Sequence, residues 1–390
     1  MKKNVGLEIG VIGCGQCGGN LANEMGRLGY NVITINTSQT DFFQLRHIPR
    51  ENKLWTPADS VEGAGANPEV GREAVEKNIE QIMNLIEKTF DKSNYILMTA
   101  GLGRGTGSGM MPLLAQVLIE QGYQVGAMVT LPSDIESPKN KIIADTAFAE
   151  LSALEGLGSL FVIDNAKASR LIPDLGVKAM YRVVNEVSVE VIDRLNELCV
   201  LPSEVAFDSK DYLTLLTQRG CAVATKLVLD VNDLENEIAL SQALKKKLDE
   251  SFFADYDFTQ TKGVAFCFDI PSSAAIKLTN ASLKKMQQEM GMPFETYTGI
   301  YEDNRKKKVY VYVIAVGLPF PDRSLEQLRN DLEEHMETIE TQFANQQKTY
   351  SGIGSTLSSR FITGINRPTQ RPKGESSTLN QILNKRKKTN

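Results

Sequence analysis

Histidine is scarce in this chain of 390 residues, which has only His47 and His335. This shortage comes close to excluding both histidine-rich zinc sites and Ser-His-Asp catalysis. The sequence also has no uncharged apolar run long enough to span a bilayer. Any hydrolytic chemistry must therefore use carboxylates, amides or a metal ion.

Cysteine is present in a pattern that argues against a disulfide framework. The five cysteines are odd in number and mostly lie in apolar runs, at Cys14, Cys17, Cys199, Cys221 and Cys267. A secreted, disulfide-rich protein is therefore not expected. Met1-Lys2-Lys3 precedes a predicted strand and not the apolar region of a signal peptide. We expect a soluble protein in the reducing cytoplasm, with no membrane span.

Length and charge indicate a globular protein of more than one domain. A chain of 390 residues is long for one domain, and its apolar content is enough for a core in each of two. The formal net charge of −5 argues against a surface that coats nucleic acid, although the C-terminal end is basic.

Glycine is concentrated between residues 100 and 109, which read Ala-Gly-Leu-Gly-Arg-Gly-Thr-Gly-Ser-Gly. A buried strand is predicted before this stretch, at Tyr95–Met98, and a helix after it, at Met110–Leu118. Backbone N–H groups of such a loop can surround an anion, and the helix N-terminus adds its positive dipole end. A merely flexible glycine turn fits less well, because such turns seldom join a buried strand to an apolar helix.

A second glycine loop opens the chain, at residues 13–20, between a predicted strand at Leu7–Ile12 and a helix at Leu21–Leu28. Gly13, Gly15 and Gly18 fit a dinucleotide-binding fingerprint, which requires an acidic residue about twenty positions on. The next strand, Asn31–Ile35, is followed by Asn36-Thr37-Ser38 and lacks that acid, so a nucleotide-dependent oxidoreductase is the weaker hypothesis. Cys14 and Cys17 also form a Cys-x-x-Cys pair, but a redox motif would normally have fewer glycines beside it.

A third loop of small residues, at residues 63–72, leads into an amphipathic helix that includes Ile79, Ile82 and Ile86. Three such loops in this order and spacing resemble the nucleotide loops of the tubulin/FtsZ superfamily of filament-forming GTPases. The signature of that family, Gly-Gly-Gly-Thr-Gly-[Ser/Thr]-Gly, occurs as residues 103–109 with Arg104 in place of the second glycine. The resemblance implies that the chain binds GTP with Mg²⁺, the ion being held on the GTP phosphates with no protein ligand assigned to it.

The resemblance also implies which residues form the site. Those that bind GTP through the loops are Gly15, Gln16, Cys17, Gly18, Gly19, Asn20, Ala64, Gly65, Ala66, Gly103, Arg104, Gly105, Thr106, Gly107 and Ser108. Beyond the loops, the family pattern matches Glu136 to a ribose contact, Asn140 to a position that is often arginine, Asn165 and Asn185 to guanine recognition, and Tyr181 to base stacking.

The catalytic loop of the family is matched by Ser203–Asp211, where the resemblance assigns hydrolysis to Asp208 and Asp211. In the superfamily this loop reaches the nucleotide of the next subunit, so hydrolysis requires head-to-tail assembly. Ser203 and Ala206 replace the family's glycine and asparagine, which leaves the rate open. Asp208 as the N-cap of a helix, with Asp211 in its first turn, is also a sound physical interpretation and is compatible with the catalytic role.

The expected fold is α/β, with a Rossmann-like GTPase domain and a smaller α+β domain after a core helix. We assign residues 1–175 to the GTP-binding domain, 176–202 to the core helix and 203–320 to the C-terminal α+β domain. Strands are expected at Gly220–Leu229, Gly263–Ile270, Phe294–Tyr301 and Lys308–Gly317, and helical runs at Leu234–Leu248 and Ala274–Met290. A long amphipathic helix is predicted over 321–349, followed by a flexible basic tail over 350–390.

The tail favours one branch of the superfamily. A long terminal helix followed by a basic tail resembles the TubZ/PhuZ branch encoded on plasmids and phages, in which the tail engages a DNA-bound adaptor protein. The resemblance therefore implies a filament that segregates or positions DNA, with itself and such an adaptor as partners. An FtsZ-type division protein, a weakly hydrolysing structural filament, and direct contact of the tail with nucleic acid remain open.

Overall fold

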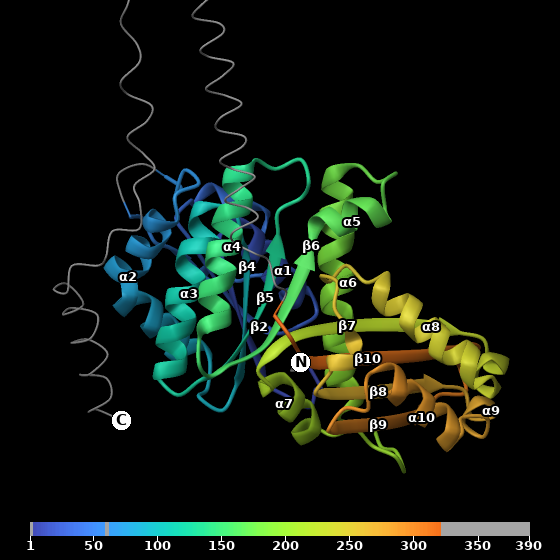
Figure 1. The fold of residues 1–390 in the computed structure, drawn as a ribbon. Coiled ribbons are helices and arrows are strands. Elements are labelled where there is room, and N and C mark those ends of the chain that lie inside the picture. The colour runs from blue at the N-terminus through green and yellow to red at the C-terminus, as the bar shows by residue number, and fades with distance from the viewer. Residues whose placement is uncertain (1–2, 59–61, 321–390) are drawn as a thin grey trace, which may run out of the picture. The chain divides into compact units, whose positions relative to one another are not determined.

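The structure, a computed structural model, describes residues 3–58 and 62–320 (Figure 1). The helix predicted over 321–349 and the tail predicted over 350–390 lie outside the described residues. The strands are β1 (Ile9–Cys14), β2 (Asn31–Asn36), β3 (Lys53–Trp55), β4 (Tyr95–Gly101), β5 (Gln124–Leu131), β6 (Leu157–Asp164), β7 (Gly220–Leu229), β8 (Gly263–Ile270), β9 (Glu295–Glu302) and β10 (Val309–Leu318).

Helices connect most of these strands. The α-helices are α1 (Gly15–Arg27), α2 (Pro68–Thr89), α3 (Gly105–Glu120), α4 (Pro138–Ala153), α5 (Asn165–Leu171), α6 (Val177–Leu198), α7 (Ser209–Thr217), α8 (Glu237–Asp249), α9 (Ser272–Ala275) and α10 (Asn280–Glu289). Short 3₁₀ helices occur at Thr40–Gln44, Arg50–Asn52, Val231–Glu235 and Phe258–Gln260. Among the described helices, none combines the length and apolar character that a membrane crossing requires.

The described strands form one sheet in the order β3-β2-β1-β4-β5-β6-β7-β10-β8-β9. Every pairing from β3 to β7 is parallel, whereas β10 runs antiparallel to both β7 and β8. The sheet passes from the first half of the chain to the second where Ser159 of β6 pairs with Gly220 of β7. Strands of both predicted domains are thus joined by backbone hydrogen bonds.

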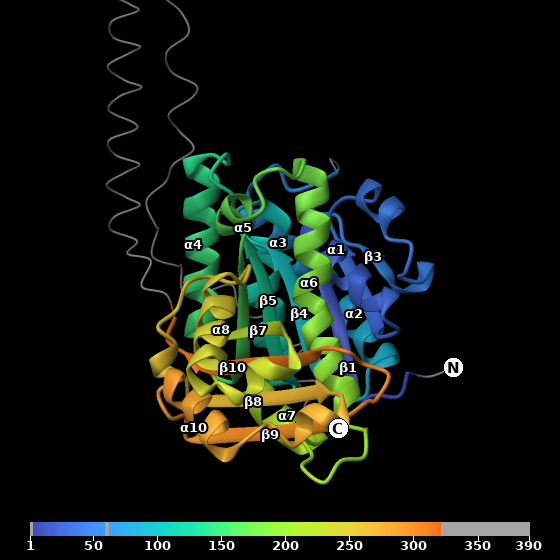
Figure 2. The ribbon, with the colours of Figure 1, turned by 90° about the vertical axis from the view of Figure 1, so that its right-hand side faces the viewer.

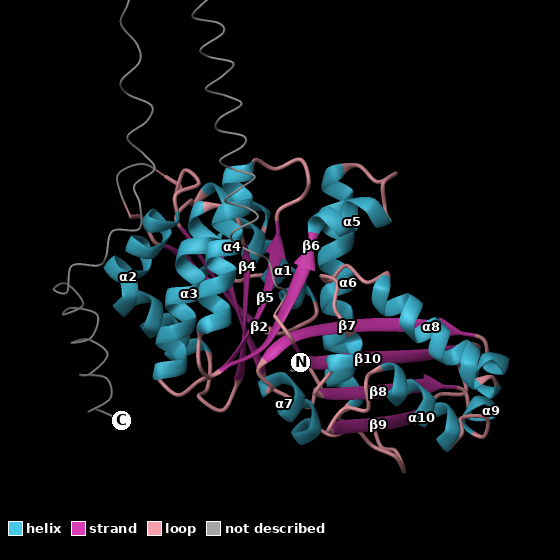
Figure 3. Ribbon diagram, viewed as in Figure 1, coloured by secondary structure: helices cyan, strands magenta, loops and turns pink. Residues whose placement is uncertain are grey.

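The central strands are apolar runs because helices cover both of their faces. Every residue of β1 is buried, as are all residues of β4 except Gly101. The helices α2, α3 and α4 pack on one face, and α1 and α6 on the other (Figures 1 and 2). Figure 3 shows the same division of helices around the strands. This doubly wound arrangement is the α/β fold expected from the sequence.

Helix α6 occupies the predicted range and links the two halves. Its apolar residues recur on one face, where Met180, Val184, Val191 and Leu195 are buried. The helix contacts α1 on one side and β7 and β10 on the other. One helix therefore carries Tyr181 and Asn185, which line the cavity described below, and also packs against strands β7 and β10 of the second half.

Several predicted boundaries were wrong. Helices α1 and α3 begin inside the glycine loops, at Gly15 and Gly105, and not after them. The run Leu234–Leu248 is a 3₁₀ turn followed by α8, because Asn236 caps a new helix by accepting from the Ala239 N–H. The run Ala274–Met290 is likewise two helices, because Thr279 caps α10.

Helix α4 was not predicted at all. Its N-cap is Ser137, whose hydroxyl accepts from the Asn140 N–H, and Pro138 occupies the first helical position. Serine followed by proline is a helix-start signal. The family resemblance assigns only contacts of Glu136 and Asn140 here, and the amphipathic pattern of the residues that follow is weak.

Candidate nucleotide site

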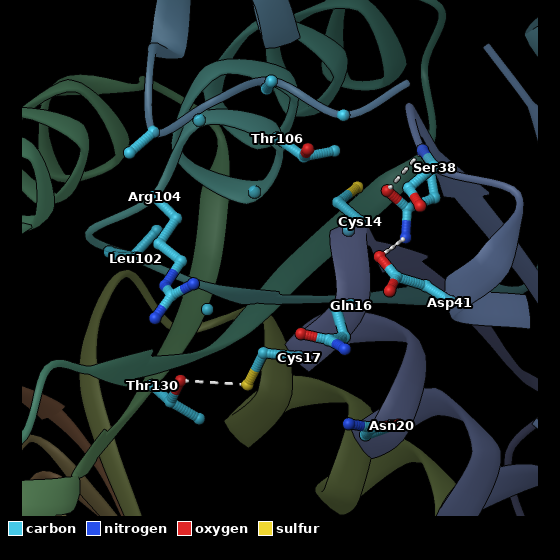
Figure 4. Close-up of a pocket in the computed structure, with 18 of the residues that line it drawn as sticks. Cys14, Gln16, Cys17, Asn20, Ser38, Asp41, Leu102, Arg104, Thr106 and Thr130 are labelled. Atoms are coloured by element: carbon cyan, nitrogen blue, oxygen red, sulfur yellow. Dashed lines mark hydrogen bonds between the residues drawn. The ribbon is translucent and has the colours of Figure 1, made fainter. Parts of the chain in front are cut away.

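A cavity of about 570 Å³ opens at the carboxyl ends of β1, β2, β4 and β5 (Figure 4). Its wall includes Cys14, Asn36, Gly101 and Leu131, one from the end of each of these strands. Open α/β sheets bind ligands at the carboxyl ends of their parallel strands. The position of the cavity is therefore that of a ligand site.

All three glycine and small-residue loops contribute to the wall. The predicted residues that line the cavity are Gly15, Gln16, Cys17, Asn20, Ala64, Gly65, Ala66, Arg104, Gly105, Thr106, Gly107, Glu136, Asn165, Tyr181 and Asn185. Loops distant in the sequence converge here because each follows a strand of the same parallel sheet.

Five predicted binding residues lie outside the lining: Gly18, Gly19, Gly103, Ser108 and Asn140. A Cβ atom on Gly18 would lie 2.1 Å from the carbonyl oxygen of Thr99, so this glycine lets α1 pack directly against β4. Ser108 accepts a 2.9 Å hydrogen bond from the Gly103 N–H and so holds the loop closed. Their position assigns Gly18 and Ser108 to building the loops.

Two helix N-termini face the cavity, those of α1 and α3. Neither N-cap side chain, of Cys14 or Arg104, makes a capping hydrogen bond, and neither helix has an acidic residue in its first turn. The first N–H groups of each helix therefore remain available, and both dipoles favour negative charge. Two convergent N-termini suit a chain of phosphates.

Figure 4 also shows wall residues that the sequence interpretation missed. Thr37 lies against the signature loop, with its Oγ1 2.8 Å from Oγ1 of Thr106. Asn36 donates to Oδ2 of Asp41 at 2.9 Å. The remaining missed wall residues are Cys14, Ser38, Gly63, Gly101, Leu102, Thr130 and Leu131. Polar residues directly after the strand Asn31–Ile35 were the available signal.

The wall at α5 and α6 carries amides and an aromatic ring. Asn165 donates through Nδ2 to the carbonyl oxygen of Leu131 at 2.9 Å, which leaves Oδ1 free to accept. Tyr181 and Asn185 lie one turn apart on α6. A ring for stacking and amides for hydrogen bonding suit a nucleobase.

Glu136 lines the cavity, but Asn140 does not. Asn140 lies in the first turn of α4, where its Nδ2 donates to Oε2 of Glu136 at 3.0 Å. This bond, and the hydrogen bond that the Asn140 N–H donates to Oγ of Ser137, hold Asn140 at the start of the helix. Asn140 is thus placed to orient Glu136.

Cys14 and Cys17 are free thiols. Burial raises the pKa of Cys14 to about 12. Burial also raises the pKa of Cys17, whose Sγ lies 3.2 Å from Oγ1 of Thr130. A redox Cys-x-x-Cys needs a lowered thiol pKa, so the redox interpretation finds no support.

The oxygen ligands near the loops fit a magnesium ion held chiefly by phosphates. Mg²⁺ is usually bound by one or two carboxylates together with substrate phosphates and waters. Asp41 offers a carboxylate, and Thr37 and Thr106 offer hydroxyls. No group of three or more acidic, cysteine or histidine side chains suited to a metal occurs in residues 3–58 and 62–320. Asp41, Thr37 and Thr106 would hold the ion, which supplies charge to offset that of the phosphates.

Asp208 and Asp211 lie away from the cavity, at the start of α7. They form a capping box: Asp208 Oδ1 accepts from the Lys210 and Asp211 N–H groups at 2.8 and 3.0 Å, and Asp211 Oδ2 accepts from the Asp208 N–H at 3.3 Å. Burial raises the pKa of Asp211. The N-cap alternative considered for this pair is thus realised.

Helix α7 packs at the amino ends of the parallel strands. Tyr95, the first residue of β4, donates its hydroxyl to the carbonyl oxygen of Leu216 at 3.1 Å. Ser159, near the start of β6, donates to that of Leu215 at 3.0 Å. Figure 1 shows α7 at the end of the sheet away from the arrowhead of β6. The two acids and the cavity are therefore at opposite ends of the strands.

The doubly wound sheet, the glycine loops and the two helix N-termini define a nucleotide-binding protein. Residues 8–173 match the Tubulin/FtsZ family, GTPase domain. The predicted family, α/β fold class, GTPase class and nucleotide are thereby confirmed. The cavity lies among the glycine loops of the matched domain, and it is called the GTP cavity below.

Relatives with different names share this domain. Cell division protein FtsZ 2 of Methanocaldococcus jannaschii is 30% identical over 261 residues, which cover 66% of this chain and 65% of that protein. Tubulin-like protein CetZ of Pyrococcus abyssi is 27% identical over 355 residues, which cover 88% of this chain and 95% of that protein. The crystal structure of a GTPγS-form protofilament of Bacillus thuringiensis serovar israelensis TubZ has a TM-score of 0.73 at 20% identity. The match covers 87% of this chain and 95% of that chain.

Proposed function

We propose that this GTPase assembles head to tail into filaments and hydrolyses GTP at the contact between subunits. The observation that carries the proposal is the separation of the GTP cavity from Asp208 and Asp211, at opposite ends of one sheet. In a single chain these carboxylates cannot reach the phosphates. A second copy stacked along the strand direction would bring its α7 to the mouth of the cavity.

Assembly of this kind would couple polymer formation to chemistry. Hydrolysis of a phosphoanhydride needs a group that orients water and charge that offsets the phosphates. Asp208 and Asp211 of one subunit would orient the water, and the other subunit would supply the loops and Mg²⁺. Such a contact is heterologous and does not close, so it produces a filament. Loss of the terminal phosphate then weakens the contact between subunits that made hydrolysis possible.

Solved structures of similar proteins favour assembly of this chain. Solved structures with this fold include a protofilament and a two-stranded filament of TubZ, and a GTPγS-bound protofilament of CetZ2 from Haloferax volcanii. These names describe those proteins. They favour the filament proposal for a chain with the same fold.

The test is light scattering recorded together with phosphate release, on the full chain with GTP and Mg²⁺. An Asp211→Asn variant removes the charge but keeps an oxygen that can accept from the Asp208 N–H, so α7 retains its cap. We expect scattering with GTP but not ATP, and phosphate release only above a critical protein concentration. In the variant, filaments should persist while release is lost.

Two outcomes would overturn this proposal. Phosphate release strictly proportional to protein concentration, with no scattering, means that a single chain hydrolyses GTP. Scattering with unchanged release in Asp211→Asn means that the carboxylate takes no part. Filaments that form without any release support the weakly hydrolysing alternative, to which Ser203 and Ala206 in the catalytic loop point.

For the cellular role, we propose segregation or positioning of plasmid or phage DNA, with the basic tail engaging a DNA-bound adaptor. Its support is the predicted terminal helix and tail, which resemble the TubZ plan, and a TubZ relative in Bacillus cereus that is 26% identical over 356 residues. FtsZ-type cell division is the alternative. Gene deletion separates them: loss of plasmid or phage inheritance in normally dividing cells supports segregation, and undivided filamentous cells support division.

A further inference from the structure

Arg104 is the one basic residue among the described residues that line the GTP cavity. The other charged residues of the wall are Asp41 and Glu136, both acidic. Arg104 makes no hydrogen bond or ion pair with any other residue in the described part of the chain. Its side chain is exposed, so its charge is available to an anion that enters the cavity.

The backbone accommodates this arginine without strain. Arg104 is the N-cap residue of α3, with φ −124° and ψ 179°, an extended conformation open to any residue. Its neighbour Gly103 has φ +109°, where a side chain would be strained. The loop therefore needs a glycine at position 103 but not at position 104.

The side chain extends into the space between the two glycine loops. In Figure 4 its guanidinium group points away from the α3 loop toward Cys17 of α1 and Thr130 near the end of β5. The N-termini of α1 and α3 face the same space, which is where the phosphates of a bound nucleotide would lie. The nucleobase wall of Tyr181 and Asn185 belongs to α6.

We propose that Arg104 binds the phosphate chain of GTP and stabilises the charge that develops during hydrolysis. This inference rests on the proposed function, since it assigns a further residue to that reaction. A guanidinium presents planar paired donors that match phosphate oxygens and stays charged at all working pH values. Arg104 thus acts from within its own subunit, beside the carboxylates contributed by the next.

In the reaction a water oxygen bonds to the terminal phosphorus while the bond from that phosphorus to the bridging oxygen breaks. The electron pair of the broken bond stays on GDP, and the proton of the water passes to phosphate or solvent. Charge moves toward the bridging oxygen as this happens. Arg104 lies where it offsets that charge, which an arginine supplied in cis does in other GTPases.

The test compares GTP with guanosine, which has no phosphate, in competition binding to the full chain. We expect Arg104→Gln to weaken GTP binding by about ten- to a hundred-fold, as charge-assisted hydrogen bonds are lost, and to leave guanosine binding unchanged. Arg104→Lys should recover part of the loss. Lys139→Gln, which removes a charge from the first turn of α4 outside the cavity lining, should bind both ligands as wild type does.

Phosphate release per assembled subunit is the second measurement, made at saturating GTP. We expect it to fall by at least about ten-fold in Arg104→Gln. Equal weakening of GTP and guanosine would mean that Arg104 shapes the pocket, and unchanged GTP binding would mean that it points to solvent. Either result overturns the inference while wild-type assembly and turnover still stand. A wild-type chain that neither assembles nor hydrolyses GTP overturns the proposed function instead.

Discussion

At the scale of the residue, Gly18 lies where two main chains meet. Its carbonyl oxygen accepts from Oγ1 of Thr99 at 2.8 Å, and a Cβ atom would lie 2.1 Å from the Thr99 carbonyl oxygen. Backbone atoms cannot yield as a flexible side chain can. The glycine therefore sets how closely α1 approaches β4 and, with it, the shape of the first phosphate loop.

We expect Gly18→Ala to lower the free energy of unfolding by about 1–3 kcal/mol, because the new methyl group overpacks this contact. GTP affinity should fall as well, since α1 must shift. Thermal unfolding and nucleotide titration measure the two effects. Gly176→Ser is the control, because a Cβ there meets no atom within 4 Å. A Gly18→Ala chain as stable as that control would contradict the argument.

Asn185 is expected to contribute to the preference for guanine. Its amide can donate to the guanine carbonyl oxygen and accept from a ring or amino N–H, whereas adenine reverses that pattern. We predict that Asn185→Ala lowers the ratio of GTP to ATP affinity by about ten-fold, because a buried hydrogen bond is lost. Val187→Ala, an exposed site on the same helix outside the cavity lining, is the control. Unchanged discrimination would remove Asn185 from base recognition.

The cysteines of the first loop give a pH-dependent prediction. The thiolate is the reactive form, and burial raises the pKa of Cys14 to about 12. Alkylation of the folded chain should therefore keep accelerating above pH 9, where a free thiol with a pKa of about 8.5 has already levelled off. Mass spectrometry of iodoacetamide-treated protein measures this, with the unfolded chain as reference. Rapid labelling at pH 7, or a Cys14–Cys17 disulfide, would contradict it.

At the scale of the element, helix α7 presents the same two carboxylates as caps and as proposed catalytic groups. Asp208 accepts from two backbone N–H groups of the first turn, and Asp211 accepts from the Asp208 N–H. Asparagine caps helices about as well as aspartate does, whereas alanine does not. Stability and catalysis can therefore be separated at this helix.

We predict that Asp208→Ala lowers the free energy of unfolding by about 1 kcal/mol and that Asp208→Asn leaves it nearly unchanged. Phosphate release should fall in both variants, because both lack the charge. Chemical denaturation and phosphate release on the same preparations provide the comparison. Full release in Asp208→Asn would leave the residue with its capping role alone.

The helices also show what a sequence pattern does and does not reveal. The predicted core helix, 176–202, contains all of α6, whose buried apolar residues lie on one face. For α4 the signal was local, at Ser137 and Pro138, and the family resemblance had drawn attention to Glu136 nearby. The starts of α1 and α3 were misjudged because glycine is a poor helix former, and packing against β4 and α2 overrides that preference.

At the scale of the whole molecule, one sheet separates the GTP cavity from α7. Hydrolysis within a filament would then need the cavity of one subunit and the acids of the next. This arrangement predicts complementation between two defective variants. Asp211→Asn keeps a complete cavity, and Asn185→Ala keeps both carboxylates.

We expect mixtures of these two variants to release phosphate faster than either does alone, at a GTP concentration that fills only the Asp211→Asn cavity. The double variant Asn185→Ala/Asp211→Asn, mixed with Asp211→Asn, is the control and should add nothing. Steady-state phosphate release across mixing ratios is the measurement. Release equal to the weighted sum of the separate variants, in mixtures that co-assemble, would place the whole reaction in one chain.

The sequence by itself determined the family, the three loops that line the cavity and most of their residues, because these depend on local order: a glycine run between a strand and a helix. Only the tertiary structure decided that Thr37 meets Thr106, that Gly18 faces main chain and not ligand, and that Asp208 and Asp211 lie at the far end of the sheet. The contact of Gly18 with the Thr99 main chain, like the other two facts, depends on which strands become neighbours and in which direction they run. That choice is made by packing between segments far apart in the chain, which no local pattern records.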